Sequence, residues 1–291
     1  MKIDLAQIQD LMRAEPQILP FSYDSKDAIL YALGVGYGQD PLDERELPFV
    51  YERGLRVAPT IVTVLGGGGQ VPNVFLRMGL DLSQILHGEE SIEIHRPLPT
   101  SGRMVREIRL TQVFDKGRDK GAVIYTQSIL RDQDNGAAIA TIERSAVARA
   151  DGGFGGSSAG QPPPHPIPDR APDFEVALPT APSQALLYRL SGDLNPLHVD
   201  PAFARKVGFP RPILHGLCTY GITCRAVLQA VADLDASRLK AHAARFSAPV
   251  FPGETIVTHI WKDGDTISFT ASVRERPGTV VIRNGRSIVS T

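Results

Sequence analysis

Apolar and polar residues alternate in two pairs of segments, one pair in each half of the chain. The segments are residues 104–114 and 121–130 in the first half, and residues 255–261 and 266–273 in the second. Because successive side chains of a strand point to opposite faces, this period of two predicts half-buried antiparallel strands. Polar, glycine-containing stretches at 116–121 and 262–265 lie between the members of each pair and predict hairpin turns.

A helical pattern accompanies the strands in each half. Residues 213–233 are mainly apolar over a length that favours a buried helix, and a similar helix is expected to begin near residues 58–65 in the first half. A sheet curled around such a helix buries the apolar face of both elements. The pattern therefore predicts two α+β units, which could share one continuous sheet.

The two halves also resemble each other directly. The stretch ILYALGVG around Tyr31 matches LLYRLSGD around Tyr188 at a constant offset of 157 residues. A serine precedes each stretch, Ser25 in one case and Ser183 in the other, and is expected to cap a short helix. The chain is therefore expected to contain a tandem repeat.

The strongest boundary between the repeats is the stretch 151–172, where glycine and serine are followed by several prolines. Glycine and serine make a chain flexible, whereas prolines make it extended and stiff. We therefore expect an N-terminal repeat at 1–150, a linker at 151–172 and a C-terminal repeat at 173–291.

Charge and cysteine content narrow the possible partners and location. The 291 residues include 31 Lys and Arg and 32 Asp and Glu, which gives a net charge of −1. This balance favours no nucleic acid or anionic membrane as a partner, and no apolar run reaches the length of a membrane span. Cys218 and Cys224 would point to different faces of a helix, so no disulfide is expected. Without a signal-peptide pattern, a cytoplasmic location is the expectation.

A polar turn in the second half, SGDLNPLHVD, gathers groups that can move or orient a proton. His198 is the side chain that exchanges protons near neutral pH, and Asp193 precedes it on a loop bent at Asn195 and Pro196. Such a loop can direct both side chains to one water molecule, which Asn195 could help to hold. The same residues also fit ordinary Asx-type turns with a half-exposed histidine, and spacing alone leaves both interpretations open.

The repeat bears on this choice. At the offset of 157, the first half has Gly36, Gly38 and Pro41 in place of the three polar residues. Residues that only shaped the turn would more readily have been kept in both halves. The difference predicts one working site per chain, in the second half.

Two further features could bind parts of a substrate. Gly216 lies in the first turn of the apolar helix, where free backbone N–H groups suit an oxyanion; a packing glycine is the alternative. Lys116 lies on the turn at 116–121, where it could bind phosphate or be part of a solvated hairpin tip. The seven histidines do not cluster at metal-ligand spacing, so no metal is expected.

From YRLSGDLNPLHVD to ILHGLCTYG, residues 188–221, the sequence resembles the MaoC-like (R)-specific enoyl-CoA hydratases, also called hydratase 2. Within this family it is most similar to the hydratase portion of the peroxisomal multifunctional enzyme type 2. The motif D-x-N-P-L-H carries the resemblance, with ILHGLCTYG at the proper distance. The stretches LHGEE, RPLP, VFDKG, GGFGG, ARFSAPVFPGE and WKDGD extend it over nearly the whole chain.

The resemblance implies a double hot dog fold and a reversible hydration of trans-2-enoyl-CoA to (3R)-3-hydroxyacyl-CoA. It implies no metal and no cofactor, because coenzyme A belongs to the substrate, and it suggests a homodimer. Asp193 and His198 would be the catalytic pair, with Asn195 from the same motif and Gly216 as the oxyanion donor. The acyl-CoA would be bound by His87, Gly88, Lys116 and Phe246, and Arg245 is a further candidate for the phosphates.

Two other functions are weighed against this one. A hot dog thioesterase would hydrolyse the thioester and release a free thiol, and an acyl-CoA-binding module would bind without turnover. An intact Asp193 and His198 pair argues against the binding module. The glycine run at 66–69 lacks the lysine of a phosphate loop and is interpreted as a helix break. Because the first half departs from the family there, chain-length preference does not carry over.

Overall fold

The computed structural model describes residues 4–69 and 72–290. Its α-helices are α1 Leu5–Arg13, α2 Ser25–Gly34, α3 Leu47–Val50, α4 Asn73–Met78, α5 Gln184–Tyr188, α6 Pro201–Lys206 and α7 Gly216–Val231. Its 3-10 helices are η1 Pro59–Thr63, η2 Leu65–Gly67, η3 Leu82–Gln84, η4 Arg189–Ser191, η5 Pro196–His198 and η6 Ala236–Arg238. Its strands are β1 Gln17–Tyr23, β2 Ile85–Ile94, β3 Gly102–Asp115, β4 Ala122–Asp132, β5 Ala138–Ala148, β6 Phe174–Pro179, β7 Leu239–Phe246, β8 Thr255–Asp263, β9 Thr266–Val273 and β10 Val280–Val289.

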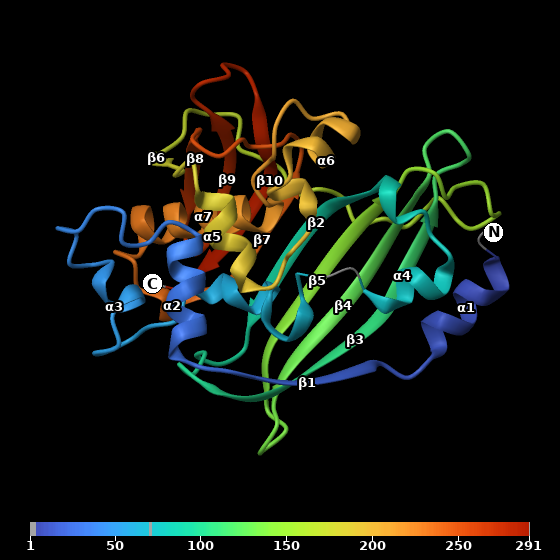
Figure 1. Ribbon diagram of the computed structural model, residues 1–291, viewed down its shortest axis with the longest axis horizontal. Helices are drawn as coiled ribbons and strands as arrows, with labels where there is room; N and C mark the ends of the chain where they lie inside the picture. Colours follow the sequence, from blue (N-terminus) through green and yellow to red (C-terminus); the bar gives the residue numbers. More distant parts are fainter. Residues whose placement is uncertain (1–3, 70–71, 291) are drawn as a thin grey trace.

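The strands form one ten-stranded antiparallel sheet in the order β1-β3-β4-β5-β2-β7-β10-β9-β8-β6 (Figure 1). The first five strands of this order come from the first half of the chain and the other five from the second. Strands β2 and β7 join the halves, with pairs that run from Glu89 and Arg245 to Glu93 and Ala241. The predicted strands, hairpins and shared sheet are confirmed, and the architecture is a double hot dog.

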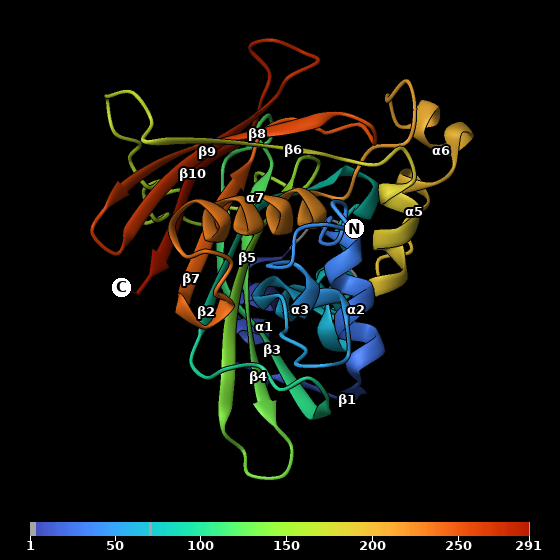
Figure 2. The ribbon, with the colours of Figure 1, turned by 90° about the vertical axis from the view of Figure 1, so that its left-hand side faces the viewer.

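The second half is built around α7, which contacts β6, β7, β8 and β10. Figure 2 shows this helix lying against the strands of the second half. Every residue from Leu217 to Leu228 is buried, as expected for a helix that is apolar all round. Cys218 and Cys224 lie on it as free, buried thiols. The predicted helix is therefore confirmed, although it covers 216–231 and not the full 213–233.

The expected helix near residues 58–65 is wrong. The segment is buried, but it forms only η1 and η2. A run of β-branched residues from Thr60 to Val64 lowers helix propensity. Gly66 and Gly67 then have φ of +62° and +79°, in the left-handed region that ends a helix. A Cβ on Gly66 would lie 2.6 Å from the Phe21 ring, so close packing also requires glycine there.

The two matching stretches pack against each other. The rings of Tyr31 in α2 and Tyr188 in α5 lie 5.9 Å apart between centroids. The expected cap at Ser25 is wrong, because Asp24 caps α2 through a capping box with Asp27. Ser183 occupies the cap position of α5 without a capping hydrogen bond. The aligned helices therefore form a close pair between the halves.

The linker at 151–172 crosses from one half to the other with contacts of its own. Its Gln161 donates to the Tyr125 hydroxyl at 3.3 Å, and its His165 Nε2 lies 2.8 Å from Ser268 Oγ. No helix in the described part of the chain is both long enough and apolar enough to cross a membrane.

Candidate active site

The polar turn between α5 and α6 is shaped by its own side chains. The Asn195 N–H donates to Asp193 Oδ1 at 3.2 Å, and Asn195 Oδ1 accepts from the Leu197 N–H at 3.0 Å. These are the Asx-type bonds that the turn interpretation expects. The Asn195 side-chain oxygen thus already accepts a hydrogen bond from the backbone at the start of η5. Any contact of this side chain with a water would use its NH₂ group.

His198, at the end of η5, is held in one tautomer. Its Nδ1 lies 2.8 Å from the carbonyl oxygen of Ile213, and a carbonyl only accepts, so the proton is on Nδ1. Burial lowers the pKa of His198, against the opposing effects of this hydrogen bond and the Asp193 charge. A neutral His198 therefore has a free lone pair on Nε2 and can accept a proton near neutral pH.

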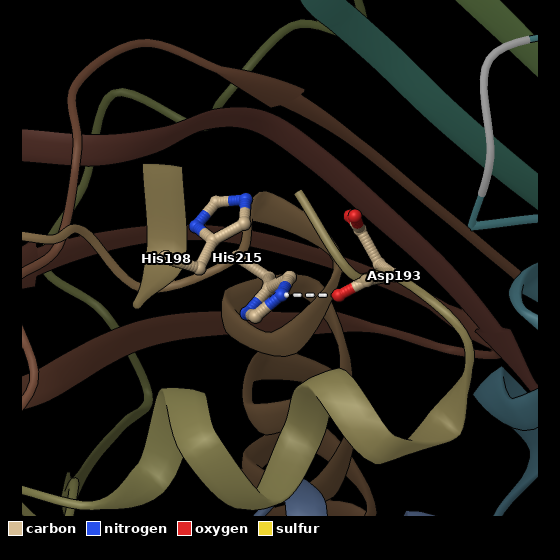
Figure 3. A group of neighbouring side chains, drawn as sticks. All are labelled: Asp193, His198 and His215. Carbon is tan, nitrogen blue, oxygen red and sulfur yellow. Dashed lines mark hydrogen bonds between the residues drawn. The ribbon is translucent and has the colours of Figure 1, made fainter. Parts of the chain in front are cut away.

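His215, the residue before α7, completes the group, and the sequence analysis did not assign it a role. Its ring stacks on the His198 ring with 3.6 Å between centroids. Its Nε2 donates to the backbone carbonyl of Asp193 at 3.2 Å (Figure 3). Burial, together with the proximity of the titratable His198 ring, lowers the pKa of His215 to about 3. This histidine is therefore neutral and supports the positions of the other two residues.

Asp193 and His198 of one turn converge with His215, which lies 22 residues after Asp193 in the chain. One side-chain nitrogen of each histidine and one Asp193 carboxylate oxygen lie within 4.8 Å of one another. Two polar atoms at such a spacing can both form hydrogen bonds to one water molecule between them. The spacing would also suit metal ligands, which the separation of the histidines in the sequence did not reveal.

Gly216 begins α7 beside the ring of Phe246. A Cβ on Gly216 would lie 3.3 Å from the Phe246 ring, so glycine keeps the helix start and the ring close without a clash. The Phe246 ring lies 4.6 Å from the His87 ring between centroids. N–H groups in the first turn of a helix lack acceptors within the helix. Three predicted residues therefore meet around a potential anion site.

The first half reaches this site through its glycine run. A Cβ on Gly69 would lie 3.2 Å from Asp193 Cβ, so the run passes directly against the candidate catalytic residue. The carbonyl of Gly68 accepts from Arg144 Nη1 at 2.6 Å. The positive φ of Gly66 agrees with a helix break. The contact with Asp193 is the feature that the sequence did not reveal.

His87 and Gly88 lie in β2 next to a buried ion pair. Glu90 accepts from Arg144 at 2.8 and 3.0 Å and from His87 Nε2 at 2.9 Å. Burial raises the pKa of Glu90, but the Arg144 charge and these hydrogen bonds together lower it to about 2. Burial lowers the pKa of His87. A Cβ on Gly88 would lie 2.7 Å from Ser145 Oγ, so this glycine serves the packing of β2 on β5.

The two predicted phosphate-binding cations already have partners. Arg245 Nε lies 2.7 Å from Glu89 Oε1, and the Arg245 side chain is 39% exposed. Lys116 Nζ donates to the Ser158 carbonyl at 3.0 Å and lies 5.3 Å from the centroid of the Phe114 ring. A phosphate would therefore have to compete with, or add to, these contacts.

Comparison with known proteins agrees with both halves. The MFE-2 hydratase 2 N-terminal domain matches residues 21–150, and the MaoC like domain matches residues 164–283. "Enoyl-CoA hydratase ChsH3" of Mycobacterium tuberculosis is 44% identical over 265 residues, which cover 90% of this chain and 91% of that protein. "Enoyl-CoA hydratase 2, peroxisomal" of Arabidopsis thaliana is 39% identical over 282 residues, covering 90% and 89% of the two chains.

A solved structure has the same architecture over the whole length. The MaoC-like dehydratase from Phytophthora capsici superposes with a TM-score of 0.86 at 34% identity, and the match covers 98% of this chain and 99% of that one. Both family models, the relatives and the fold thus agree. The chain belongs to the hydratase 2 family of MaoC-like proteins.

Proposed function

We propose that this chain is an enzyme of fatty-acyl-CoA metabolism that reversibly hydrates trans-2-enoyl-CoA to (3R)-3-hydroxyacyl-CoA. The observation that carries the proposal is the convergence of Asp193 and His198 beside the start of α7. Family membership supports the same reaction, because the relatives named above are called enoyl-CoA hydratases.

The proposed reaction uses one water molecule. The Asp193 and His198 pair takes a proton from the water as its oxygen attacks C3 of the enoyl group. The electron pair of the double bond moves toward the thioester oxygen, where an enolate forms. The Gly216 N–H at the start of α7 stabilises that oxyanion. A proton from the pair then reaches C2, which restores the thioester and leaves the 3-hydroxyacyl product.

The stereochemistry of the product tests the assignment. Hydration of crotonyl-CoA by the purified protein should give a product that an (R)-specific 3-hydroxyacyl-CoA dehydrogenase oxidises. The same product should be inert to an (S)-specific dehydrogenase, which serves as the matched control. A predominantly (3S) product would remove the assignment to hydratase 2 chemistry.

Two other activities are tested in the same reaction mixture. A thioesterase would release free coenzyme A, so a thiol reagent should detect no increase while the enoyl absorbance falls. A binding module would bind acyl-CoA without any fall in absorbance. Thiol release at the rate of substrate loss would favour the thioesterase.

We also propose that the side chains act without a metal or other cofactor. His198 Nδ1 donates to the Ile213 carbonyl, so its Nε2 lone pair can accept the proton of the water directly. Activity should survive dialysis against a chelator. A loss that added zinc restored would contradict the proposal.

A homodimer in the cytoplasm completes the proposal. The family resemblance supports the dimer, and sedimentation at several protein concentrations should give twice the chain mass. The Arabidopsis relative is named as peroxisomal, so fractionation of the source cells is the direct test of location. A monomer, or recovery in an organelle, would overturn the corresponding part.

A further inference from the structure

The first half contains a cavity of about 300 Å³ beside the candidate active site. Residues of β1, η2, α4, β3, β4 and β5 line it. The cavity exists because the first half has only short 3-10 turns where the second half has the long helix α7. Gly68 lines it, and the next residue, Gly69, packs on Asp193. The glycine run therefore lines the cavity and also contacts the catalytic turn.

Two arginines distinguish the lining from that of a purely hydrocarbon site. Arg106 and Arg144 both line it, together with Thr126 and Ser128 of β4. On each of β3, β4 and β5 the lining residues are two positions apart, so their side chains share one face of the sheet. A second cavity, of about 500 Å³, lies on the other side of Gly67 and has neither arginine nor lysine in its lining. The two cavities therefore suit different chemical groups.

Arg106 carries a buried charge without an ion-pair partner in the described part of the chain. The residue is 2% exposed. Its Nη1 donates to the carbonyls of Val62 and Leu65 at 3.2 and 2.8 Å, and its Nε has no partner among the described residues. Burial and the Arg144 charge lower the pKa of Arg106 to about 9. An uncompensated buried cation is costly unless an anion is bound next to it.

Arg144 does not need a further anion, since Glu90 already neutralises it. Arg144 binds both Glu90 oxygens and the carbonyl of Gly68. The charged groups that act on Arg106 are Arg144 and Glu90. The Asp193 charge also acts on Arg144, but neither Glu90 nor Asp193 forms an ion pair with Arg106 among the described residues.

We propose that the cavity receives the far end of the acyl chain and that Arg106 binds a carboxylate there. The preferred substrates are then enoyl-CoA thioesters whose acyl chain ends in a second carboxylate. This inference rests on the proposed function and names its substrate class. A guanidinium recognises a carboxylate through charge-assisted hydrogen bonds, and Thr126 and Ser128 supply additional donors. The competing explanation is that Arg106 only holds the carbonyls of η1 and η2 in place.

Binding of saturated acyl-CoA pairs separates these explanations without requiring turnover. Decanoyl-CoA is compared with the monothioester of decanedioic acid by calorimetry, and the comparison is repeated with shorter and longer pairs. At the best length, the carboxylate should bind at least about tenfold more tightly, the usual effect of a hydrogen bond to a charged group. No preference at any length would overturn the inference.

Two arginine variants locate the effect. Arg106→Met should abolish the preference, whereas Arg109→Met should keep it, because Arg109 is exposed on the same strand and does not line this cavity. Should Arg106→Met fail to fold, Arg106→Lys retains the charge and should retain part of the preference. A preference unchanged in a folded Arg106 variant would overturn the inference. Equal affinity for a terminal hydroxyl would overturn the carboxylate assignment.

Hydration of the unsubstituted enoyl-CoA distinguishes this inference from the proposed function. If the protein hydrates the plain substrate but shows no carboxylate preference, only the inference fails. If it binds the carboxylate more tightly but hydrates neither substrate, only the proposed function fails.

Discussion

The proposed catalytic turn after α5 and its counterpart after α2 differ in how their polar groups are paired. Around the counterpart, Glu46 accepts from the Gly38 N–H at 2.7 Å and from Arg225 Nε at 2.8 Å. Glu46 and Arg225 are 3% and 5% exposed, so these buried charges neutralise each other. The Asp193 carboxylate instead accepts only a backbone N–H of its own turn and has no ion-pair partner among the described residues, and His198 Nε2 keeps a free lone pair. The two turns therefore differ in whether a cation neutralises their carboxylate.

The start of the buried helical segment differs in the same way. At the offset of 157, Gly216 corresponds to Pro59, and each is the first residue of its helical segment. Proline has no N–H group, so the first half lacks the proposed oxyanion donor as well as the polar turn. Losing these groups and the long helix left the first half free to form cavities next to the other half's active site.

The largest effect is expected for the catalytic pair. Asp193→Asn or His198→Gln should lower kcat by at least about a hundredfold, the scale of a positioned acid or base. The double variant should be little worse than the worse single one, because both groups act on one water. Initial rates of crotonyl-CoA hydration measure this, with circular dichroism as the check on folding. Losses that multiply would contradict a shared water.

The counterpart turn should give the reverse result. Glu46→Gln removes one partner of the buried pair and should lower the free energy of unfolding by about 3–5 kcal/mol. The kcat of the folded protein should stay close to that of the wild type. Urea unfolding and initial rates measure the two effects. Arg45→Ala, in an exposed ion pair with Asp43, is the control and should change stability by less than about 1 kcal/mol.

If Glu46→Gln lowered kcat as strongly as the Asp193 variant while leaving stability unchanged, the division of roles would be wrong. The first half would then contribute directly to the reaction.

The sequence predicts the strands and the tandem repeat, because alternation and the match at an offset of 157 can both be seen directly in the residue order. It did not predict the missing helix near residues 58–65. A short apolar run fits a buried helix or another buried segment equally well. Only packing reveals that Gly66 must lie against Phe21. The conformation of that segment and the position of its end therefore depend on tertiary contacts.

The site was predicted where one motif holds its residues and missed where tertiary contact brings them together. Asp193 and His198 lie in one turn, whereas His215 joins them only through stacking and a hydrogen bond. Glu46 and Arg225 are 179 residues apart, and no spacing rule connects them. The expected serine cap at Ser25 failed because the neighbouring Asp24 takes the capping position.

Substitution of Gly216 tests the comparison between the starts of the two helical segments. Gly216→Val should lower kcat by about tenfold to a hundredfold, approaching the effect of losing one oxyanion donor. A Cβ there already meets the Phe246 ring at 3.3 Å, and the larger side chain would displace the thioester oxygen. Gly216→Ala should have a smaller effect, and circular dichroism must show α7 intact. An unchanged kcat in a folded Gly216→Val variant would make this a packing glycine.

Acid should lower the free energy of unfolding, because the second half contains buried histidines. Burial lowers the pKa of His215 and His242 to about 3, against about 6.5 in an unfolded chain. The unfolded state therefore binds more protons between these values, so their contribution to stability is complete above about pH 6.5 and is lost as the pH falls toward 3. Urea unfolding at several pH values should show this slope, and His242→Gln should flatten it. A pH-independent free energy of unfolding would contradict the burial argument.

The smallest effect on activity is expected at Lys116. It is compared with Lys120, a second lysine of the same turn. Lys116→Ala should raise KM by about two- to fivefold with kcat unchanged, since a phosphate contact is equal in ground and transition states. The salt dependence of KM should weaken, because an exposed ion pair is screened. Lys120→Ala removes the same charge from an exposed position on the turn and should leave KM unchanged. If Lys116→Ala behaves like Lys120→Ala at low salt, then the contact with Ser158 is the role of Lys116. Arg245, paired with Glu89, would then be the next phosphate candidate.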